Sequence, residues 1–309
     1  MILSGVNDSA NERLSPLVNA LKKFILLSAI STFIVGCSSN SGQFVDSGSL
    51  LLAEPEPISQ RIQMVIARYT HILYRADLET AERAELLFQR GNAYDAIGLK
   101  SLAVIDYNEA VRLKPDLAEA HNSIGVHHIQ TGNFLQAYES FDATLEINPD
   151  YNFALLNRGV ALYYGGRSTL AATDTKAFWT LEKSDPYRLL WLYITEAKND
   201  PIAALQALGE RKQYVTDDTW ASVLIEFYLD EVNETKVIAK LLENVTSQTE
   251  LNNRLCEAYF YIGKYHLARG NNFIARNYFK LSLSTNVHEF VEHKYSRVEL
   301  GNLRRQQLQ

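Results

Sequence analysis

Hydrophobic residues recur at helical spacing along most of the chain beyond residue 57. In the segment 58–76 they lie three or four positions apart, which is the period of one face of an α-helix. These residues are Ile62, Val65, Ile66, Tyr69, Ile72 and Leu73. No segment shows the sustained alternation of apolar and polar residues that indicates a β-strand. The pattern predicts an all-α protein with an N-terminal helix within residues 58–83.

Residues 84–183 repeat with a period of 34 residues. The recurring small residues are Gly91, Gly125 and Gly159, then Gly98, Gly132 and Gly166, then Ala103, Ala137 and Ala171. This period is typical of tetratricopeptide (TPR) repeats, whose units are pairs of antiparallel helices. The small residues allow the two helices to approach closely, and aromatic residues such as Tyr107 and Phe141 fill the space between them. We expect three TPR units here, the third one degraded.

A fourth unit is predicted at 256–287. Gly263, Gly270, Ala275 and Phe279 have the same internal spacing as Gly91, Gly98, Ala103 and Tyr107. The segment 184–255 between the third and fourth units is helical in composition but lies outside the period. It predicts helices at 188–197, 202–211, 218–229 and 234–242. Stacked units of this kind form a solenoid with a curved groove.

The first helix of each unit lines the concave face in TPR proteins. Candidate groove residues are Phe88, Asn92, Asp95, Asn122, Val126, Ile129, Gln130, Phe153, Leu156, Tyr163 and Tyr164. Aromatic rings beside amides suit a bound peptide. Packing of these residues against the protein's own N-terminal or middle helices is the alternative, and the sequence leaves both possibilities open.

One known TPR groove binds a C-terminal carboxylate through Lys, Arg and Asn side chains. The matching positions in this chain are Phe88, Asn92, Ser123, Phe153 and Asn157. Only Asn92 has the required residue type. The sequence therefore excludes this carboxylate clamp.

The segment VHEFVEHKY, residues 287–295, is the one place where two histidines stand close to two glutamates. A zincin helix needs histidines four residues apart, but His288 and His293 are five apart. On a helix their directions differ by about 140°, so they cannot bind one metal ion together. We expect a surface helix with ion pairs His288–Glu292 and Glu289–His293, and no metal site.

The position of this segment favours a capping role. It follows the fourth unit, where Phe290, Val291, Tyr295 and Val298 form an apolar stripe. Near the end of the sequence, the residues Arg304, Arg305, Gln306 and Gln307 are all polar. A solenoid needs such an end, because its last interface would otherwise expose apolar surface. Residues 288–309 are therefore predicted to form a C-terminal capping helix.

The N-terminal residues predict export. Lys22 and Lys23 precede an apolar run at 24–35 that is shorter than the ~20 residues of a membrane span. The following IVGC resembles a bacterial lipobox, in which Cys37 is diacylated after residues 1–36 are removed. Ser38 after the cysteine resembles lipoproteins sent to the outer membrane. Residues 37–57 are rich in Ser, Gly and Pro and predict a flexible linker.

Composition narrows the function classes. The formal charge of −6 argues against nucleic-acid binding, which depends on clustered Lys and Arg. The content of hydrophobic residues, 47%, is ample for a buried core. If Cys37 carries lipid, Cys256 has no partner in the chain, and we expect it to be buried and inert.

The order of these elements resembles the NlpI family of outer-membrane lipoproteins with TPR repeats. The resemblance covers about Lys22 to Leu300 and is closest in LNRGVALYYGGR and VHEFVEHKY. It implies a homodimer without catalytic activity or cofactor, anchored in the outer membrane and facing the periplasm. The implied function is that of an adaptor. Such an adaptor binds peptidoglycan endopeptidases and a periplasmic C-terminal-processing protease, and so regulates cell-wall turnover and cell division.

A different class of protein also combines a lipobox with TPR units. Assembly lipoproteins, such as pilotins of pilus secretins and barrel-assembly subunits, are therefore the alternative.

Overall fold

The structure, a computed structural model, describes residues 51–216 and 219–307. These residues belong to one unit of the chain, Ser47–Gln309. The predicted signal peptide, the lipid attachment residue Cys37 and most of the predicted linker lie outside the described residues. In the part that is described, all regular structure is helical, and the predicted all-α helical repeat fold is confirmed.

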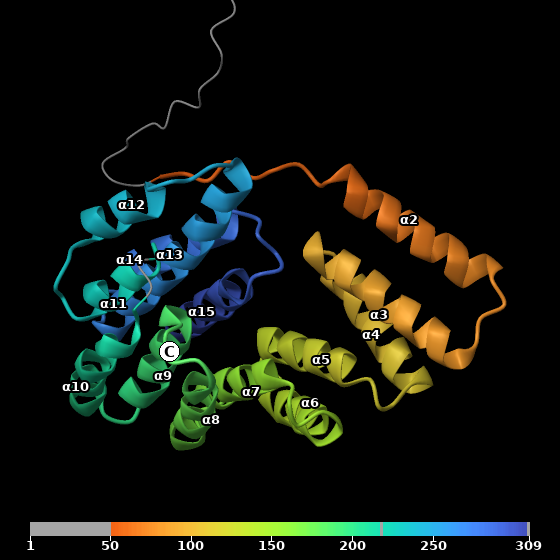
Figure 1. The fold of residues 1–309 in the computed structure, drawn as a ribbon, viewed down its shortest axis with the longest axis horizontal. Helices are drawn as coiled ribbons and strands as arrows, with labels where there is room; N and C mark the ends of the chain where they lie inside the picture. Colours follow the sequence, from red (N-terminus) through yellow and green to blue (C-terminus); the bar gives the residue numbers. More distant parts are fainter. Residues whose placement is uncertain (1–50, 217–218, 308–309) are drawn as a thin grey trace, which may run out of the picture. The chain divides into compact units, whose positions relative to one another are not determined.

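Four antiparallel helix pairs contain the repeated residues (Figure 1). The pairs are α3 (Thr80–Ala96) with α4 (Lys100–Leu113), α5 (Ala118–Thr131) with α6 (Phe134–Ile147), α7 (Asn152–Tyr164) with α8 (Ser168–Leu181), and α13 (Gln248–Ala268) with α14 (Asn272–Ser284). The first three pairs follow one another directly. The fourth stands apart in sequence, after the irregular segment.

The first glycine of a unit is needed for close packing within the pair. A Cβ atom on Gly91 would lie 2.7 Å from the ring of Tyr107, and one on Gly263 would lie 2.7 Å from the ring of Phe279. Both rings are fully buried. The second glycine, such as Gly98 with φ of 78°, ends the first helix in the left-handed conformation that glycine adopts without steric cost.

The irregular segment begins after the third unit, which lacks the aromatic residue that fills the space between the two helices of the other units. Thr175 replaces the aromatic residue, and its hydroxyl lies 2.7 Å from Thr195 Oγ1 on the next helix, α9. The segment contains α9 (Pro186–Ala197), α10 (Pro201–Arg211), the 3₁₀ turn η1 (Lys212–Tyr214), α11 (Ser222–Tyr228) and α12 (Glu234–Leu242). Asp185 and Asp200 cap α9 and α10, which both begin with proline.

Two helix starts differ from the predicted ones by four residues or more. The helix expected at 218–229 is shorter, since α11 begins at Ser222 after a turn. The first helix of the fourth unit begins at Gln248 rather than at residue 256, because Ser247 provides its N-cap by accepting a hydrogen bond from the Glu250 amide. The sequence assignment missed this cap, which lies outside the repeat period.

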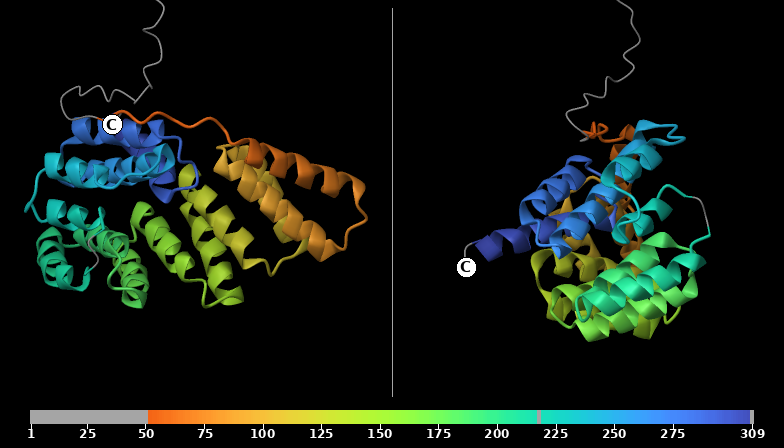
Figure 2. Two further views of the ribbon diagram at one scale, coloured as in Figure 1. Left: turned by 45° about the horizontal axis from the view of Figure 1, so that its top comes forward. Right: turned by 90° about the vertical axis from the view of Figure 1, so that its left-hand side faces the viewer.

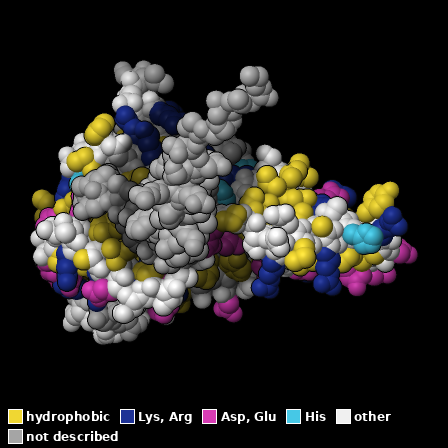
Figure 3. Space-filling view, turned by 90° about the horizontal axis from the view of Figure 1, so that it is seen from above, with side chains coloured by type: hydrophobic (Ala, Val, Ile, Leu, Met, Phe, Trp, Pro, Cys, Tyr) yellow, Lys and Arg dark blue, Asp and Glu magenta, His cyan; other side chains and the backbone are white. Residues whose placement is uncertain are grey.

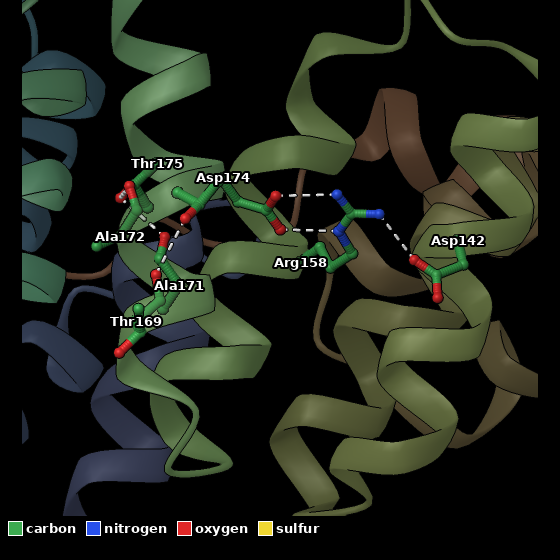
Figure 4. Close-up of polar contacts among 8 residues, drawn as sticks. Asp142, Arg158, Thr169, Ala171, Ala172, Asp174 and Thr175 are labelled. Atoms are coloured by element: carbon green, nitrogen blue, oxygen red, sulfur yellow. Dashed lines mark hydrogen bonds and ion pairs between the residues drawn. The ribbon is translucent and has the colours of Figure 1, made fainter.

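An arginine links neighbouring units (Figure 4). Arg158 on α7 binds Asp174 of its own unit at 2.7 Å and Asp142 of the preceding unit at 2.8 Å. Arg90 and Asp106 form the same pair at 2.7 Å, two periods earlier in the chain. The pairs Arg90–Asp106 and Arg158–Asp174 join the two helices of one unit, whereas Arg158–Asp142 joins two neighbouring units.

The predicted N-terminal helix lies within residues 58–83 and ends near residues 76–83, where the sequence indicated a break. Helix α2 (Gln60–Arg75) ends before a short break, and Thr80 begins α3. Helix α2 packs along α3 but buries none of its residues. Met64 and Tyr74 are 65% and 85% exposed, and Figure 3 shows hydrophobic side chains gathered at the end of the molecule where α2 lies.

The described end of the predicted linker, 51–57, is bound to the fold rather than free. Asn252 on α13 donates a hydrogen bond to the Glu54 carbonyl oxygen at 2.9 Å, and Thr249 donates to the Glu56 carboxylate at 2.8 Å. Leu51 and Ala53 pack against the core. The chain therefore crosses from α13 to α2 as an extended segment (Figures 1 and 2).

The last helix, α15 (Val291–Gln307), packs against α14 and α13 and also reaches α5 (Figure 2). It does cover the fourth unit, as a cap would. The expectation that its first turns form an exposed, ion-paired surface is wrong, because Glu292, His293 and Lys294 are all buried. The helix is an internal element between the two ends of the solenoid.

Candidate binding groove

The predicted groove residues fall into three groups. Phe88, Val126, Ile129 and Leu156 are buried in the hydrophobic core of the repeats. Asn92 accepts a hydrogen bond from the Tyr107 hydroxyl at 2.9 Å, and Gln130 accepts one from Lys100. These side chains stabilise the repeats themselves, and of this group only Val126 and Leu156 also line the opening described below.

A second group contacts the chain's own C-terminal helix. Asp95 on α3 forms an ion pair with Lys294 of α15 at 2.8 Å and lies 3.3 Å from His127 Nε2. Burial opposes ionisation of Asp95, but the hydrogen bond from His127 and the charge of Lys294 lower its pKa to about 2. The first repeat is thereby joined electrostatically to α15.

The two tyrosines at the end of α7 also contact the C-terminal part of the chain. Tyr164 donates a hydrogen bond to Glu299 Oε1 at 2.9 Å, and Tyr163 accepts one from Lys264 at 2.9 Å. Lys264 and Glu299 form an ion pair at 2.5 Å whose side chains are 3% and 4% exposed. Although burial lowers it, the pKa of Lys264 is raised overall by the nearby carboxylate of Glu299, so the ammonium group stays charged.

The side-chain amides of Asn122 and Asn157 form a further contact between the repeats and α15. Asn157 donates a hydrogen bond to Asn122 at 3.0 Å and accepts one from the Tyr295 hydroxyl at 3.4 Å. Of the two possibilities that the sequence left open, packing within the protein is therefore realised for much of the groove. The polar partners of these groove residues include Lys264 on α13 and Lys294, Tyr295 and Glu299 on α15, which the sequence did not indicate.

A third group still faces an opening, which we call the groove cavity. It has a volume of about 280 Å³ and is lined by Asp95, Asn122, Ser123, Val126, Tyr151, Phe153, Leu156, Asn157, Val291 and Lys294. Phe153 is 60% exposed, although its ring lies 5.7 Å from that of Phe178. An exposed ring beside buried amides and a charged pair offers both apolar contact and hydrogen bonds.

Sequence reasoning missed the side chains that α15 contributes, Val291 and Lys294 to the cavity and Glu299 to the buried pair. The sequence predicted the helix that carries these residues, but not the repeats against which it packs. The apolar stripe through Tyr295 and Val298 was the signal available, because it shows that the helix is buried on one side. The stripe does not show that charged residues beside it are buried as well.

The VHEFVEHKY segment has a packing role. Glu292 accepts a hydrogen bond from Tyr261 at 3.1 Å, and His293 Nε2 lies 3.3 Å from the Leu283 carbonyl oxygen. His288 packs on Gly98 of the first repeat. Neither predicted pair, His288–Glu292 or Glu289–His293, is among the ion pairs of residues 51–216 and 219–307. Within those ranges no group of three or more His, Cys, Asp or Glu residues is placed to hold a metal ion.

Cys256 is fully buried, as predicted. Burial raises the pKa of its thiol to about 12, which keeps it protonated and unreactive. None of the helices in the described part of the chain combines the length and the apolar character needed to cross a membrane.

Comparison with known proteins agrees with this geometry. The family model described as tetratricopeptide repeat matches residues 84–117, which contain α3 and α4. The chain is a tetratricopeptide repeat protein. TPR solenoids bind other proteins on extended concave surfaces, and TPR scaffolds are generally non-catalytic.

Solved structures of TPR-like proteins resemble this one at low sequence identity. The apo form of RapI has a TM-score of 0.54 and 16% identity, covering 73% of this chain and 92% of its own. A tetratricopeptide repeat protein from Parabacteroides merdae has a TM-score of 0.47 and 15% identity, and the match covers 80% of this chain and 100% of that protein's chain. YrrB, described as a TPR protein with an unusual peptide-binding site, has a TM-score of 0.41 and 13% identity. The match covers 70% of this chain and 91% of the YrrB chain. At these identities the RapI likeness supports the fold alone.

Proposed function

We propose that this TPR protein is a non-catalytic adaptor that holds a segment of a partner protein in the groove cavity. The observation that carries the proposal is the ring of Phe153, which is 60% exposed in an opening that Asn122, Asn157 and the Asp95–Lys294 pair also line. An exposed aromatic anchor surrounded by fixed polar groups is a common basis of peptide recognition.

The resemblance to the NlpI family supplies the setting of this proposal. The protein would be a homodimeric lipoprotein attached through Cys37 to the outer membrane and facing the periplasm. Its partners would be peptidoglycan endopeptidases and a C-terminal-processing protease. By bringing the endopeptidase to the protease it would regulate cell-wall turnover and cell division. Cys37 and its surroundings lie outside the described residues, so the anchor rests on the lipobox sequence.

Binding to purified partners tests the adaptor function. The protein is mixed with a wall endopeptidase and with the processing protease, and affinities are measured by biolayer interferometry. Phe153→Glu is expected to weaken binding by roughly 30-fold, because loss of an aromatic anchor costs about 2 kcal/mol or more. Phe273→Glu is the matched control, since Phe273 is 73% exposed on α14, away from the groove. Equal weakening by both variants would exclude the groove cavity as the binding face.

Cellular tests address partner identity and location. Deletion of the gene is expected to raise the level and half-life of the endopeptidase, and unchanged values would refute the role in its degradation. Loss of secretin multimers would instead favour the assembly-lipoprotein alternative. Cys37→Ala is expected to release a folded protein from the membrane. A variant that stays in the membrane fraction would contradict the lipobox assignment.

A further inference from the structure

A larger opening lies along the later turns of α15, and we call it the basic cleft. It has a volume of about 1060 Å³ and is formed by parts of α7, α9, α10, α11, α13, α14 and α15. The nearly buried pair Lys264–Glu299 lines it and marks its floor. Val291 and Lys294 at the start of α15 line the groove cavity, and Glu299 and Arg305 on its later turns line the basic cleft. The two openings therefore lie at different positions along this helix.

Apolar side chains form an uncovered wall of the basic cleft. Ile202 and Leu205 on α10 are 83% and 37% exposed, and Leu267 and Leu303 line the opening from α13 and α15. Exposed apolar surface beside polar residues in a concave opening marks an interaction site more often than a chance arrangement. A ligand of the cleft should therefore carry apolar groups.

The charges of the basic cleft are predominantly positive. Its lining contains four cationic residues, Lys198, Lys264, Arg269 and Arg305, and one acidic residue, Glu299. Glu299 neutralises Lys264, and Asp230 binds Arg269 at 2.9 Å. Lys198 and Arg305 belong to none of the ion pairs formed by the described residues. Two uncompensated positive charges thus flank the opening in a chain whose formal charge is −6.

We propose that the basic cleft binds an acidic, amphipathic segment of a partner protein. Apolar side chains of the segment would pack on Ile202 and Leu205, and its carboxylates would pair with Lys198 and Arg305. Charge complementarity of this kind selects the partner and accelerates association. The concave shape favours a protein segment over an anionic membrane, because a flat bilayer surface cannot reach the floor beside Lys264. This site goes beyond the proposed function, which uses only the groove cavity.

Fluorescence anisotropy with defined peptides tests the proposal. The probe is a labelled peptide that alternates two Glu with two Leu, and its counterpart carries Gln in place of Glu. We expect saturable binding of the Glu peptide, weaker binding of the Gln peptide, and loss of affinity as salt rises. In the double variant Lys198→Glu/Arg305→Glu the affinity should fall at least roughly tenfold. Ile202→Ala should also weaken binding. Because Ile202 is 83% exposed, this change removes little packing from the fold.

Matched controls make the outcome decisive. Lys176→Glu/Lys280→Glu reverses two exposed lysines on α8 and α14 and should change the affinity less than about twofold. Phe153→Glu should leave peptide binding unchanged, which separates this site from the groove cavity. Absence of saturable binding, or equal loss in the control double variant, would overturn the proposal. So would displacement of the peptide by phosphatidylglycerol vesicles that bind through the same two cations, because the cleft would then serve a membrane surface.

Discussion

The first and fourth repeats share an internal register but have different surroundings. Gly91 and Gly263 each face an aromatic ring that leaves no room for a Cβ atom. Helix α3 nevertheless buries four residues, whereas α13 buries twelve, because α13 is enclosed by α12, α14 and α15. Repeat residues thus determine how two helices of one unit pack. The neighbouring elements determine whether the rest of the helix is surface or core.

Their ion pairs differ in the same way. Arg90 and Asp106 join the two helices of the first repeat, with side chains 18% and 5% exposed. Lys264 and Glu299 are 3% and 4% exposed and join the fourth repeat to α15. The first pair strengthens the first repeat, whereas the second connects the fourth repeat to α15, the helix that lines both the groove cavity and the basic cleft.

The largest effect is expected from Glu299→Gln. It leaves the Lys264 ammonium buried without a charged partner, which should lower the free energy of unfolding by about 3–5 kcal/mol. Urea denaturation followed by circular dichroism measures this change. The double variant Lys264→Met/Glu299→Leu should recover most of the loss, since it buries no charge. A loss below about 1 kcal/mol in the single variant would show that water reaches the pair.

A pH dependence is expected from Glu257 on α13. Burial and the nearby charge of Glu292 raise the pKa of Glu257 to about 8. The folded state then holds a proton that the unfolded state releases near pH 4.5, so stability should fall as pH rises from 4.5 to 8. Between pH 6.5 and 8 the free energy of unfolding should fall by roughly 2 kcal/mol. Denaturation midpoints across this range measure it.

Two variants check the assignment of this pH dependence. Glu257→Gln should remove most of the slope, while Glu85→Gln should retain it, because Glu85 is the exposed residue at the same position of the first repeat. His293 acts in the opposite direction and only at lower pH. Burial lowers its pKa to about 3, so its contribution to stability is lost as pH falls below 6.5. A flat profile above pH 6.5 in the wild type would contradict the prediction.

A smaller effect is expected when the two equivalent turn glycines, Gly98 and Gly270, are changed to alanine and the resulting losses of stability are compared. Gly98 and Gly270 have φ values of 78° and 76°, so alanine at either position should cost about 1–2 kcal/mol in backbone strain. A Cβ atom on Gly98 would also lie 2.9 Å from the His288 ring, whereas nothing lies within 4 Å of Gly270. Gly98→Ala should therefore cost about 1 kcal/mol more. Equal thermal stabilities would show that His288 moves aside freely.

The smallest effect is expected at the link between the second and third repeats. Asp142, with a side chain 61% exposed, should contribute less than about 1 kcal/mol through Arg158. The side chain of Asp174 is 10% exposed and accepts two hydrogen bonds from the Arg158 guanidinium. Asp174→Ala should therefore lower the free energy of unfolding by about 1.5–3 kcal/mol. Chemical denaturation of the two variants compares them. A reversed order would show that the contact between units matters more than the contact within one.

The helix pairs and their packing were predictable from sequence. The contacts between Gly91 and Tyr107 and between Gly263 and Phe279 span 16 residues each, so one periodic pattern contains both partners. The Asp and Ser caps could also have been found locally, although the cap at Ser247 was missed because it lies outside the period. The candidate groove was only partly predictable, since Phe153 is exposed there while Phe88 and Val126 belong to the core.

The sequence of this protein thus specifies its TPR units, because steric fit between small and aromatic residues acts within one helix pair. It also specifies that residues 291–307 form a helix with one apolar face. Only the tertiary structure decides that this helix lies between the first and fourth repeats, where Lys294 meets Asp95 and Glu299 meets Lys264. An apolar stripe shows that a helix must be buried, but it carries no information on which distant surface covers it. The two openings beside α15 follow from that placement.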